Sequence, residues 1–345
     1  MFEPESTNGQ TESDDKRPRP RLGFLGVGWI GQHRLKSIAD ARHAEIVGLA
    51  DLNPGVVAAA ALEVPGADVQ ESLQDLLRMD LDGIVIATPT ALHPEQAIAA
   101  LDARLAVFCQ KPLGRSARET ESVIEAARRA DRLLGVDMSY RFVSAVREIK
   151  DRIDAGAIGD VYAIDLMFHN AYGPDKPWYY DPKLAGGGCV IDLGIHLVDM
   201  ALWMTGANVA EVSSRLYAQG KRIRPEDHRL EDYATARLDL DSGATANLAC
   251  SWHMNAGADA VIGASFFGTK GGLAIRNVNG SFYDFIAEEF IGTERKVIAE
   301  PPDSWGGRAV VDWAARLAES PAFDPAIESG GAVARVIDAI YQRSE

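Results

Sequence analysis

The stretch RLGFLGVGWIGQHRLKSIAD, residues 21–40, passes from a short apolar strand into a helical pattern through three closely spaced glycines. These glycines form a GxGxxG pattern in the strand-to-helix context that a dinucleotide-binding turn requires. The first glycine permits a tight turn, the second lets a pyrophosphate approach the backbone, and the third allows the helix to pack on the strand. The residues predicted to line this phosphate site are Gly26, Gly28, Trp29, Ile30 and Gly31.

The next strand, EIVGLAD at residues 45–51, ends in an acid. Asp51 follows Gly31 by twenty residues, where a carboxylate accepts hydrogen bonds from the ribose hydroxyls of NAD. The alternative is that Asp51 only caps the strand. Because no Arg or Lys follows in DLNPGVV to neutralise the extra phosphate of NADP, the sequence predicts NAD as the cofactor and NADP as the less favoured one.

Strands and helices keep alternating after Asp51. A buried strand at 83–87 meets a Thr-Pro-Thr turn and a helix starting near His93, and a strand at 105–109 runs into Lys111. This alternation predicts an α/β fold with a parallel Rossmann sheet, whose ligands lie at the carboxyl ends of the strands. The further residues expected at this cofactor edge are Thr88, Pro89, His93 and Lys111.

The chain divides into three predicted segments. Residues 1–20 are polar, acidic and proline-bearing, without the apolar core of a signal peptide, and are predicted to be a disordered tail. Residues 21–141 form the predicted Rossmann domain, because LLGVDMS supplies its last strand. Residues 142–345 form the predicted substrate-binding and oligomerisation domain.

Composition narrows the class of partner. The chain has 50 acidic and 35 basic residues, a formal net charge of -15, which argues against nucleic acid and anionic membranes as partners and favours a small molecule. No run reaches the roughly 18 consecutive apolar residues of a membrane span. Three cysteines, far apart and in no metal-binding spacing, suit a reducing cytoplasm, and small buried thiols are their expected role.

A second stretch, GGGCVIDLGIHLVDM at residues 186–200, carries three titratable groups in otherwise apolar surroundings. The spacing of Asp192, His196 and Asp199 would place them within roughly 60° of each other on an α-helix. The sequence therefore predicts a buried helix with a narrow polar stripe. Three interpretations stay open: a structural Asp192–His196 pair, a metal site, or acid–base chemistry in a cleft. With one His, two Asp and no Cys in register, no metal is expected.

The chain resembles the glucose-fructose oxidoreductase / inositol dehydrogenase / MocA (Gfo/Idh/MocA) family from Arg21 to its C-terminus. The resemblance is carried by the nucleotide fingerprint, the ATPTALHP turn, the Lys111-Pro112 motif and the GGGCVIDLGIHLVD stretch, which is similar to the family's DxGxHxxD. It implies a catalytic group of Lys111, Asp192 and His196. The chain departs from the family in having Gln110 where Glu is usual, which removes a carboxylate beside the lysine.

The resemblance also implies a C-terminal α+β domain with an open, mostly antiparallel sheet that receives substrate and mediates oligomerisation. The sequence supports this sheet independently. VYAIDLMFH alternates, with Tyr162, Ile164, Leu166 and Phe168 on one face, and DYATARLDLDSGATANLACSW has the pattern of a hairpin turning at Asp241-Ser242-Gly243. An uncovered sheet face makes a homodimer or homotetramer through this domain the expected assembly.

The predicted activity is reversible hydride transfer between NAD and a secondary alcohol carbon of a sugar or cyclitol. His196 is the expected proton acceptor, Asp192 orients it or holds a substrate hydroxyl, and Lys111 donates to the developing carbonyl. Asp199 is expected to anchor the helix. The predicted substrate-binding residues are Lys111, His169, Asn170, Asp192 and His196, with the aromatic residues Trp178, Tyr179 and Tyr180 either stacking on a sugar or simply packing, and Trp252 and His253 as weaker candidates.

Two other functions stay open at this point. A related enzyme could use bound NAD for redox-neutral glycoside cleavage or epimerisation, with no net cofactor turnover. A non-catalytic NAD-sensing regulator would be expected to have lost the lysine and the histidine, and both are present here.

Overall fold

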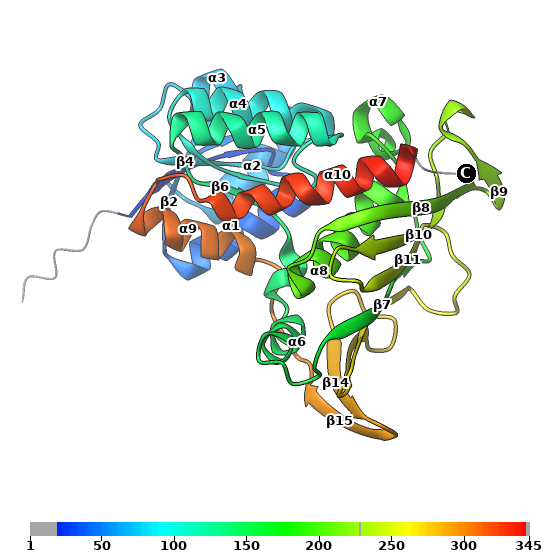
Figure 1. Ribbon diagram of the computed structural model, residues 1–345. Coiled ribbons are helices and arrows are strands. Elements are labelled where there is room, and N and C mark those ends of the chain that lie inside the picture. Colours follow the sequence, from blue (N-terminus) through cyan, green and yellow to red (C-terminus); the bar gives the residue numbers. More distant parts are fainter. Residues whose placement is uncertain (1–18, 228, 343–345) are drawn as a thin grey trace, which may run out of the picture.

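The computed structural model describes residues 19–227 and 229–342, and the chain forms two units, each built on one sheet (Figure 1). The first unit contains a six-stranded parallel sheet in the order β3-β2-β1-β4-β5-β6, with helices on both faces. This order confirms the predicted Rossmann fold. Residues 1–18 of the predicted disordered tail lie outside the described residues, whereas Pro20 is already buried in the folded part.

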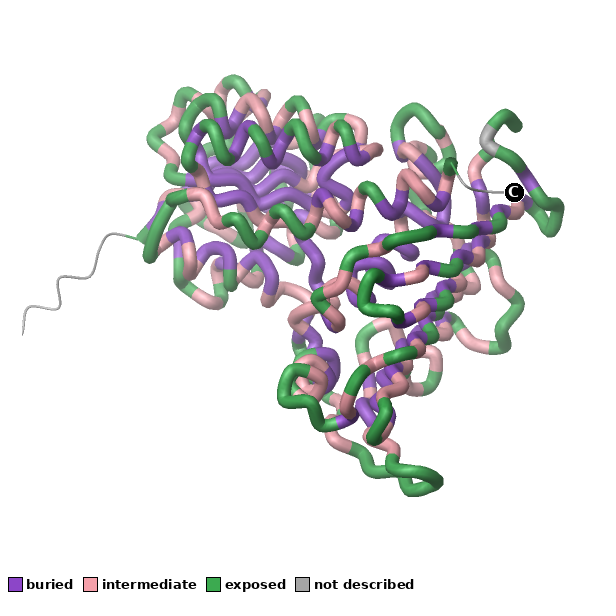
Figure 2. Tube along the Cα trace, viewed as in Figure 1, coloured by how far each residue is buried: buried purple, intermediate pink, exposed green. Residues whose placement is uncertain are grey.

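The strands of the first sheet are continuous apolar runs because helices cover both of its faces. Figure 2 shows these strands as buried along most of their length, under helices with exposed outer sides. The strands are β1 Arg21–Leu25, β2 Glu45–Ala50, β3 Asp68–Gln70, β4 Gly83–Ile86, β5 Ala106–Cys109 and β6 Leu134–Val136. The helices are α1 Trp29–Ala41, α2 Pro54–Glu63, α3 Leu73–Leu76, α4 His93–Asp102 and α5 Ala117–Ala130.

The second unit contains a nine-stranded sheet in the order β15-β14-β13-β12-β7-β11-β10-β8-β9. Only the β7–β11 pair is parallel among the described strands of this sheet, so the expected mostly antiparallel sheet is confirmed. Its strands are β7 Val161–Asn170, β8 Val209–Ala218, β9 Lys221–Ile223, β10 Tyr233–Leu240, β11 Thr245–Ser251, β12 Ala260–Gly268, β13 Gly272–Asn277, β14 Phe285–Ile291 and β15 Glu294–Ala299. Its helices are α6 Ser144–Asp154, α7 Pro182–Ala185, α8 Ile195–Thr205 and α10 Glu328–Gln342.

Helices α6, α8 and α10 cover one face of the second sheet, and its other face is open. The predicted alternation along β7 holds for Ile164, Leu166 and Phe168, which are buried under the helices. Tyr162 departs from it: the ring is 58% exposed, because the helices do not cover the start of the strand. The predicted hairpin is confirmed as the antiparallel pair β10 and β11.

The chain returns to the first unit after the second sheet is complete. Helix α9, Arg308–Glu319, packs beside α1 and against the first sheet, where the Trp313 ring lies 5.8 Å from that of Phe108 (Figure 1). Helix α10 then packs against both α5 and α8. A single division at Arg141 does not describe this arrangement, because α9 completes the core of the Rossmann unit from the far end of the chain.

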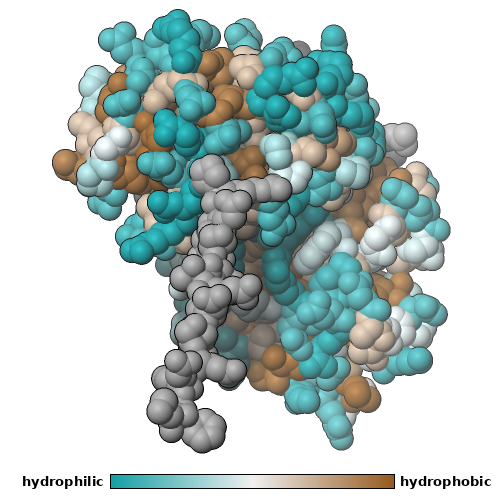
Figure 3. Space-filling view, turned by 90° about the vertical axis from the view of Figure 1, so that its left-hand side faces the viewer, coloured by the Kyte–Doolittle hydropathy of each residue, from teal (hydrophilic) through white to brown (hydrophobic). Residues whose placement is uncertain are grey.

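One described segment, Pro182–Thr205, is long and apolar enough to cross a membrane by length and composition. In the fold, 83% of its most apolar window is buried between the second sheet and its neighbours, which is typical of a core helix. The face of the molecule in Figure 3 is mainly hydrophilic with scattered apolar side chains, in keeping with a chain of which 25% of the residues are charged.

Candidate active site

The glycine-rich turn has the geometry that a pyrophosphate site needs. Gly26 has a φ of +83°, and a Cβ on Gly31 would lie 2.2 Å from the carbonyl oxygen of Gly26, so both positions exclude a side chain. A Cβ on Gly28 would meet nothing within 4 Å, which leaves the backbone there open to a ligand. Gly28 also precedes α1 without a side-chain cap, so the first N–H groups of the helix face that space.

Asp51 lies directly beside this turn. Its carboxylate accepts hydrogen bonds from the backbone N–H of Val27 at 2.8 Å and of Asn53 at 2.9 Å. Each carboxylate oxygen retains a lone pair, so the group can also accept from ribose hydroxyls. Trp29, at the start of α1, is 63% exposed and packs on the His33 ring, 4.7 Å away. These residues fit NAD at the carboxyl edge of the sheet.

His93 contacts the backbone of two neighbouring turns. The side chain is buried, and its two ring nitrogens lie 2.8 Å from the Pro112 carbonyl oxygen and 2.7 Å from that of Thr88. Both nitrogens are therefore occupied by backbone, because the histidine ties the turn after β4 to the turn after β5. Burial lowers the pKa of His93. Its role as a cofactor-binding residue stays a prediction.

Lys111 joins the two units at the edge of the first sheet. Its Nζ donates to the backbone carbonyl of Asp192 at 2.7 Å and to Asp192 Oδ1 at 2.8 Å. An ammonium has three N–H groups, so one remains for a further acceptor. Both side chains keep some exposure, 18% for the lysine and 15% for the aspartate, and the pair therefore lines a surface that a ligand can reach.

Asp192 lies in a π-helical turn, Val190–Gly194, that precedes α8. The Asp192 carboxylate accepts from Lys111 Nζ through Oδ1 and from Trp252 Nε1 through Oδ2, the latter at 3.1 Å. The expected stripe of Asp192, His196 and Asp199 assumed α-helical geometry throughout, whereas the turn that carries Asp192 is π-helical. Single π-helical turns within α-helices are frequent at functional sites.

His196 lies one turn further along and is 7% exposed. Its ring packs on that of Tyr140, with 4.8 Å between the centroids, and no hydrogen bond links it to Asp192 within residues 19–227 and 229–342. The interpretation as a structural Asp192–His196 pair is therefore wrong. Burial, with the charge of Lys111 as a second cause, holds the pKa of His196 well below its usual value. The imidazole is neutral at pH 7 and able to accept a proton.

Asp199 has the anchoring contact that was expected of it. Its two carboxylate oxygens accept from Arg141 Nε at 2.8 Å and from a terminal nitrogen of the same guanidinium. This bidentate pair ties α8 to the segment that connects the two units.

Gln110 has an unexpected partner. Its Nε2 donates to Asp137 Oδ2, which also accepts from Arg34 Nε, and all three side chains are at most 8% exposed. The partner of Gln110 is thus the carboxylate of Asp137, which follows β6. The second oxygen of Asp137 has no hydrogen-bond partner among the described residues.

Glu231 is a site residue that sequence analysis missed. Its buried carboxylate accepts from the backbone N–H of Gly188 and of Val190 and from the Tyr341 hydroxyl, all at 2.9–3.1 Å. Burial raises its pKa, while these donors lower it. Glu231 therefore fixes the start of the turn that carries Asp192. No local signal identifies it, because its partners lie 41 to 110 residues away in sequence.

The predicted substrate residues on β7, His169 and Asn170, have hydrogen-bond partners outside the group of Lys111, Asp192 and His196. His169 Nδ1 lies 2.8 Å from the Ser251 hydroxyl, and Asn170 accepts from the backbone N–H of Tyr172. The aromatic loop lies closer to it: burial and then the charge of Asp192 raise the pKa values of Tyr179 and Tyr180. Trp252, ranked as a weak candidate, is the aromatic residue that contacts the Asp192 carboxylate.

No group of three or more potential metal ligands occurs within the described parts of the chain. The three cysteines, Cys109, Cys189 and Cys250, are free thiols and buried.

The fold and this site define an oxidoreductase with an NAD-binding domain. The model of the oxidoreductase family with an NAD-binding Rossmann fold matches residues 21–138, and that of the GFO/IDH/MocA C-terminal domain matches residues 146–274. The chain belongs to the Gfo/Idh/MocA family.

Individual relatives agree with this assignment. The chain is 29% identical to the uncharacterized oxidoreductase YrbE of Bacillus subtilis (strain 168), over 78% of this chain and 77% of the relative. It is 22% identical to the D-glucoside 3-dehydrogenase of Escherichia coli (strain K12), over 94% and 95%. A solved oxidoreductase domain protein from Kribbella flavida is similar with a TM-score of 0.82 and 25% identity, over 95% of this chain and 97% of that one.

Proposed function

We propose that the protein is an NAD-dependent dehydrogenase that oxidises a secondary alcohol of a sugar or cyclitol, reversibly, to the ketone. The observation that carries the proposal is the contact between Lys111 of the first unit and Asp192 of the second, with the neutral imidazole of His196 one turn away. Lys111 and Asp192 come from separate units and meet at the carboxyl edge of the first sheet, where the dinucleotide is expected to bind. A polar substrate bound between the units can complete their hydrogen bonds.

The chain's own groups would act on the substrate oxygen. The free N–H of Lys111 donates to it, and Asp192 holds that lysine through two hydrogen bonds. His196 accepts the hydroxyl proton, which its depressed pKa allows because the ring is unprotonated at pH 7. The carbon releases its hydrogen with the bonding electron pair, and the C–O bond becomes the carbonyl.

The electron pair requires an acceptor, and bound NAD supplies this chemistry. The residues that would hold it are Gly26, Gly28, Gly31 and the start of α1 for the pyrophosphate, with Asp51 for the ribose. The open backbone at Gly28 and the uncapped start of α1 fit that group.

The test is substitution of the proposed proton acceptor. With a panel of sugars and inositols as substrates, His196→Ala and Lys111→Ala should each lower turnover by about two to four orders of magnitude, measured as NADH formation. NAD binding, measured by calorimetry, should persist in His196→Ala. The matched control is His43→Ala, because that histidine is exposed and distant from the cleft in sequence and fold.

A purely structural role predicts the opposite pattern. His196→Ala would then keep near wild-type turnover while it loses about 1–3 kcal/mol of unfolding free energy. That result would reject the catalytic assignment.

We also propose a homodimer or homotetramer that assembles through the open face of the second sheet. Met167 and Val297 are each 41% exposed, and Met167 lies on that open face. Analytical ultracentrifugation should show the oligomer, and Met167→Lys should weaken it.

Three buried free thiols support a cytoplasmic location, which fractionation with a tagged chain would test.

A further inference from the structure

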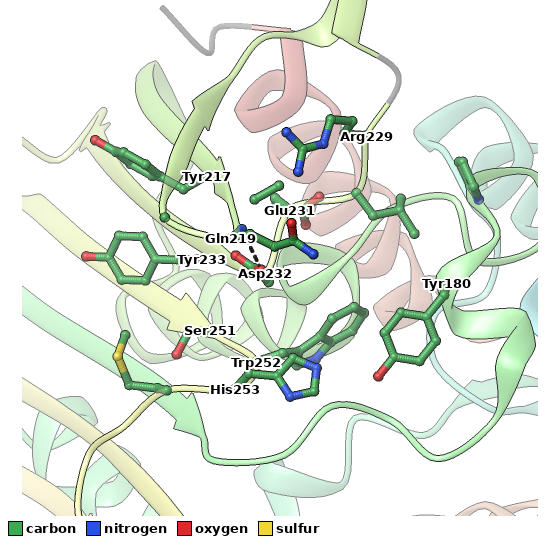
Figure 4. Close-up of a pocket in the computed structure, with 15 residues that line it drawn as sticks. Tyr180, Tyr217, Gln219, Arg229, Glu231, Asp232, Tyr233, Ser251, Trp252 and His253 are labelled. Atoms are coloured by element: carbon green, nitrogen blue, oxygen red, sulfur yellow. Dashed lines mark hydrogen bonds between the residues drawn. The ribbon is translucent and has the colours of Figure 1, made fainter.

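A cavity of about 940 Å³ is lined by Trp252, whose indole N–H donates to the Asp192 carboxylate (Figure 4 shows the cavity). This volume is near the upper end of the range for small-molecule pockets, about 300–1,000 Å³. Strands β8, β10 and β11 and the loop before α7 form its walls. Its side chains include Tyr180, Tyr217, Arg229, Tyr233, Trp252 and His253.

The cavity shares a wall with the proposed active site. Trp252 lines the cavity and donates its indole N–H to Asp192, and the Tyr180 ring meets the indole edge-on, with 5.8 Å between centroids. Tyr180 is 48% exposed and lies within the field of Asp192. Trp252 therefore links the Asp192 carboxylate directly to the wall of the cavity.

This wall is closely packed. A Cβ on Gly173 would lie 2.1 Å from the Tyr180 hydroxyl oxygen and 2.4 Å from His253 Nε2, so the loop approaches both side chains as closely as only glycine permits. His253 itself has a φ of +57°, a conformation that residues with a Cβ rarely adopt and that is often found at ligand sites. The loop at Gly173 thus lies directly against the ends of the Tyr180 and His253 side chains.

The far wall is aromatic. Tyr217 and Tyr233 are cross-strand neighbours on β8 and β10, with 5.6 Å between their ring centroids. Figure 4 shows both rings on the same side of the cavity, opposite Tyr180. Rigid aromatic rings give a large contact area to another ring at a low cost in conformational entropy.

The charges of the cavity do not suit a phosphate. Arg229 is the one lysine or arginine among its described lining residues, and the carboxylates of Glu231 and Asp232 lie in the same walls. Phosphate groups are held by several cationic or N–H donors, without carboxylates beside them. The Asp232 carboxylate accepts from the backbone N–H of Gln219 at 2.7 Å and can accept from ligand hydroxyls as well.

We propose that this cavity is a subsite for the second, uncharged ring of a glycoside. The sugar ring that is oxidised lies at Lys111, Asp192 and His196, and the substituent on it, a second sugar or an aryl group, packs against Tyr217 and Tyr233. The inference rests on the proposed function and narrows its substrate class from sugars and cyclitols to neutral glycosides.

The experiment compares phenyl β-D-glucoside and cellobiose with D-glucose, using NAD and the full chain. Tyr217→Ala and Tyr233→Ala should each raise KM for phenyl glucoside and cellobiose about fivefold, the scale of one lost aromatic contact, with kcat unchanged. KM and kcat for glucose should be the same in these variants as in wild type. Tyr162→Ala is the matched control, because that ring is exposed on β7 and does not line the cavity.

A second measurement is independent of turnover. In saturation-transfer NMR with the NAD-loaded protein, the phenyl protons of the glucoside should receive magnetisation from wild type and lose it in the double variant Tyr217→Ala/Tyr233→Ala. Equal effects of the substitutions on glucose and glucosides, or unchanged phenyl signals, would overturn the subsite. Binding of phenyl glucoside at the tyrosines without oxidation of any sugar, cyclitol or glycoside would instead overturn the proposed function and retain the subsite.

Discussion

Replacement of Gln110 by Glu, the family's usual residue, should destabilise this protein. Gln110 Nε2 donates to Asp137 Oδ2, and Arg34 Nε already donates to the same oxygen. Gln110→Glu replaces that donor with a second carboxylate in a site where Asp137 is 1% exposed. Two ionised carboxylates cannot share this site at low cost, so the new group should take up a proton.

Proton uptake sets the size of the effect. A carboxyl kept neutral at pH 7 costs about 1.4 kcal/mol for each pH unit above its normal pKa near 4.3, which limits the loss of unfolding free energy to about 3.7 kcal/mol. At pH 5 the same limit is about 1 kcal/mol. The folded-state pKa of the introduced carboxyl group is raised in this variant, so its contribution to stability is present at low pH and is lost as the pH rises.

The assay is urea unfolding of wild type and variants at pH 5, 6, 7 and 8. The difference between wild type and Gln110→Glu should grow with pH, and the double variant Gln110→Glu/Asp137→Asn should recover most of it because one carboxylate again faces Arg34. Gln342→Glu, at the exposed end of α10, is the control for an added charge. A Gln110→Glu protein as stable as wild type at pH 8, or a double variant no better than the single one, would refute the reasoning.

Three further outcomes are expected. Asp51→Ala should narrow the preference for NAD over NADP in kcat/KM, because the carboxylate beside the glycine turn repels the extra phosphate; an unchanged ratio would contradict this role. Gly188→Ala should lower the thermal midpoint and the yield of folded protein, because its Cβ would lie 2.0 Å from the Glu231 carbonyl oxygen, whereas Gly306→Ala, with open space around it, should not. Burial lowers the pKa of His196, so the contribution of the neutral ring to stability is full above pH 6.5 and is lost as the pH falls. His196→Gln should therefore lose less unfolding free energy than wild type between pH 7 and pH 5. Curves of unfolding free energy against pH that run parallel for the two proteins would contradict this prediction.

The Rossmann unit could be predicted from the sequence because its signals are local. The roles of Gly26 and Gly31 follow from the space around a single turn, and the structure gives them a positive φ and a 2.2 Å Cβ approach, respectively. Strand positions followed from apolar runs bounded by turns, and those quoted for β1, β2, β4 and β5 lie within one residue of the observed strands, whereas LLGVDMS extends three residues beyond the end of β6. Asp51 could be placed beside the turn because the strand order brings neighbouring carboxyl ends together.

The remaining features depend on contacts between distant segments. The spacing of Asp192 and His196 suggested an α-helix, but the turn at Val190–Gly194 is π-helical, and no residue type marks such a turn. No local feature of the sequence indicates that Trp313 of α9 packs beside Phe108 of the first sheet. Glu231 was missed for the same reason, since its role exists only once the chain has folded.

The position of Asp192 explains why the two units must be joined as they are. Its carboxylate accepts from Lys111 of the Rossmann unit and from Trp252 at the end of β11, and Glu231 holds the turn on which it stands. A separation of the two units would break both lysine contacts and leave a partly buried carboxylate with the indole alone, which is costly. The Lys111–Asp192 contact therefore keeps the cleft at one width. A ligand that enters it meets a lysine N–H and a neutral imidazole already in place, so little of its binding free energy is spent on ordering the site.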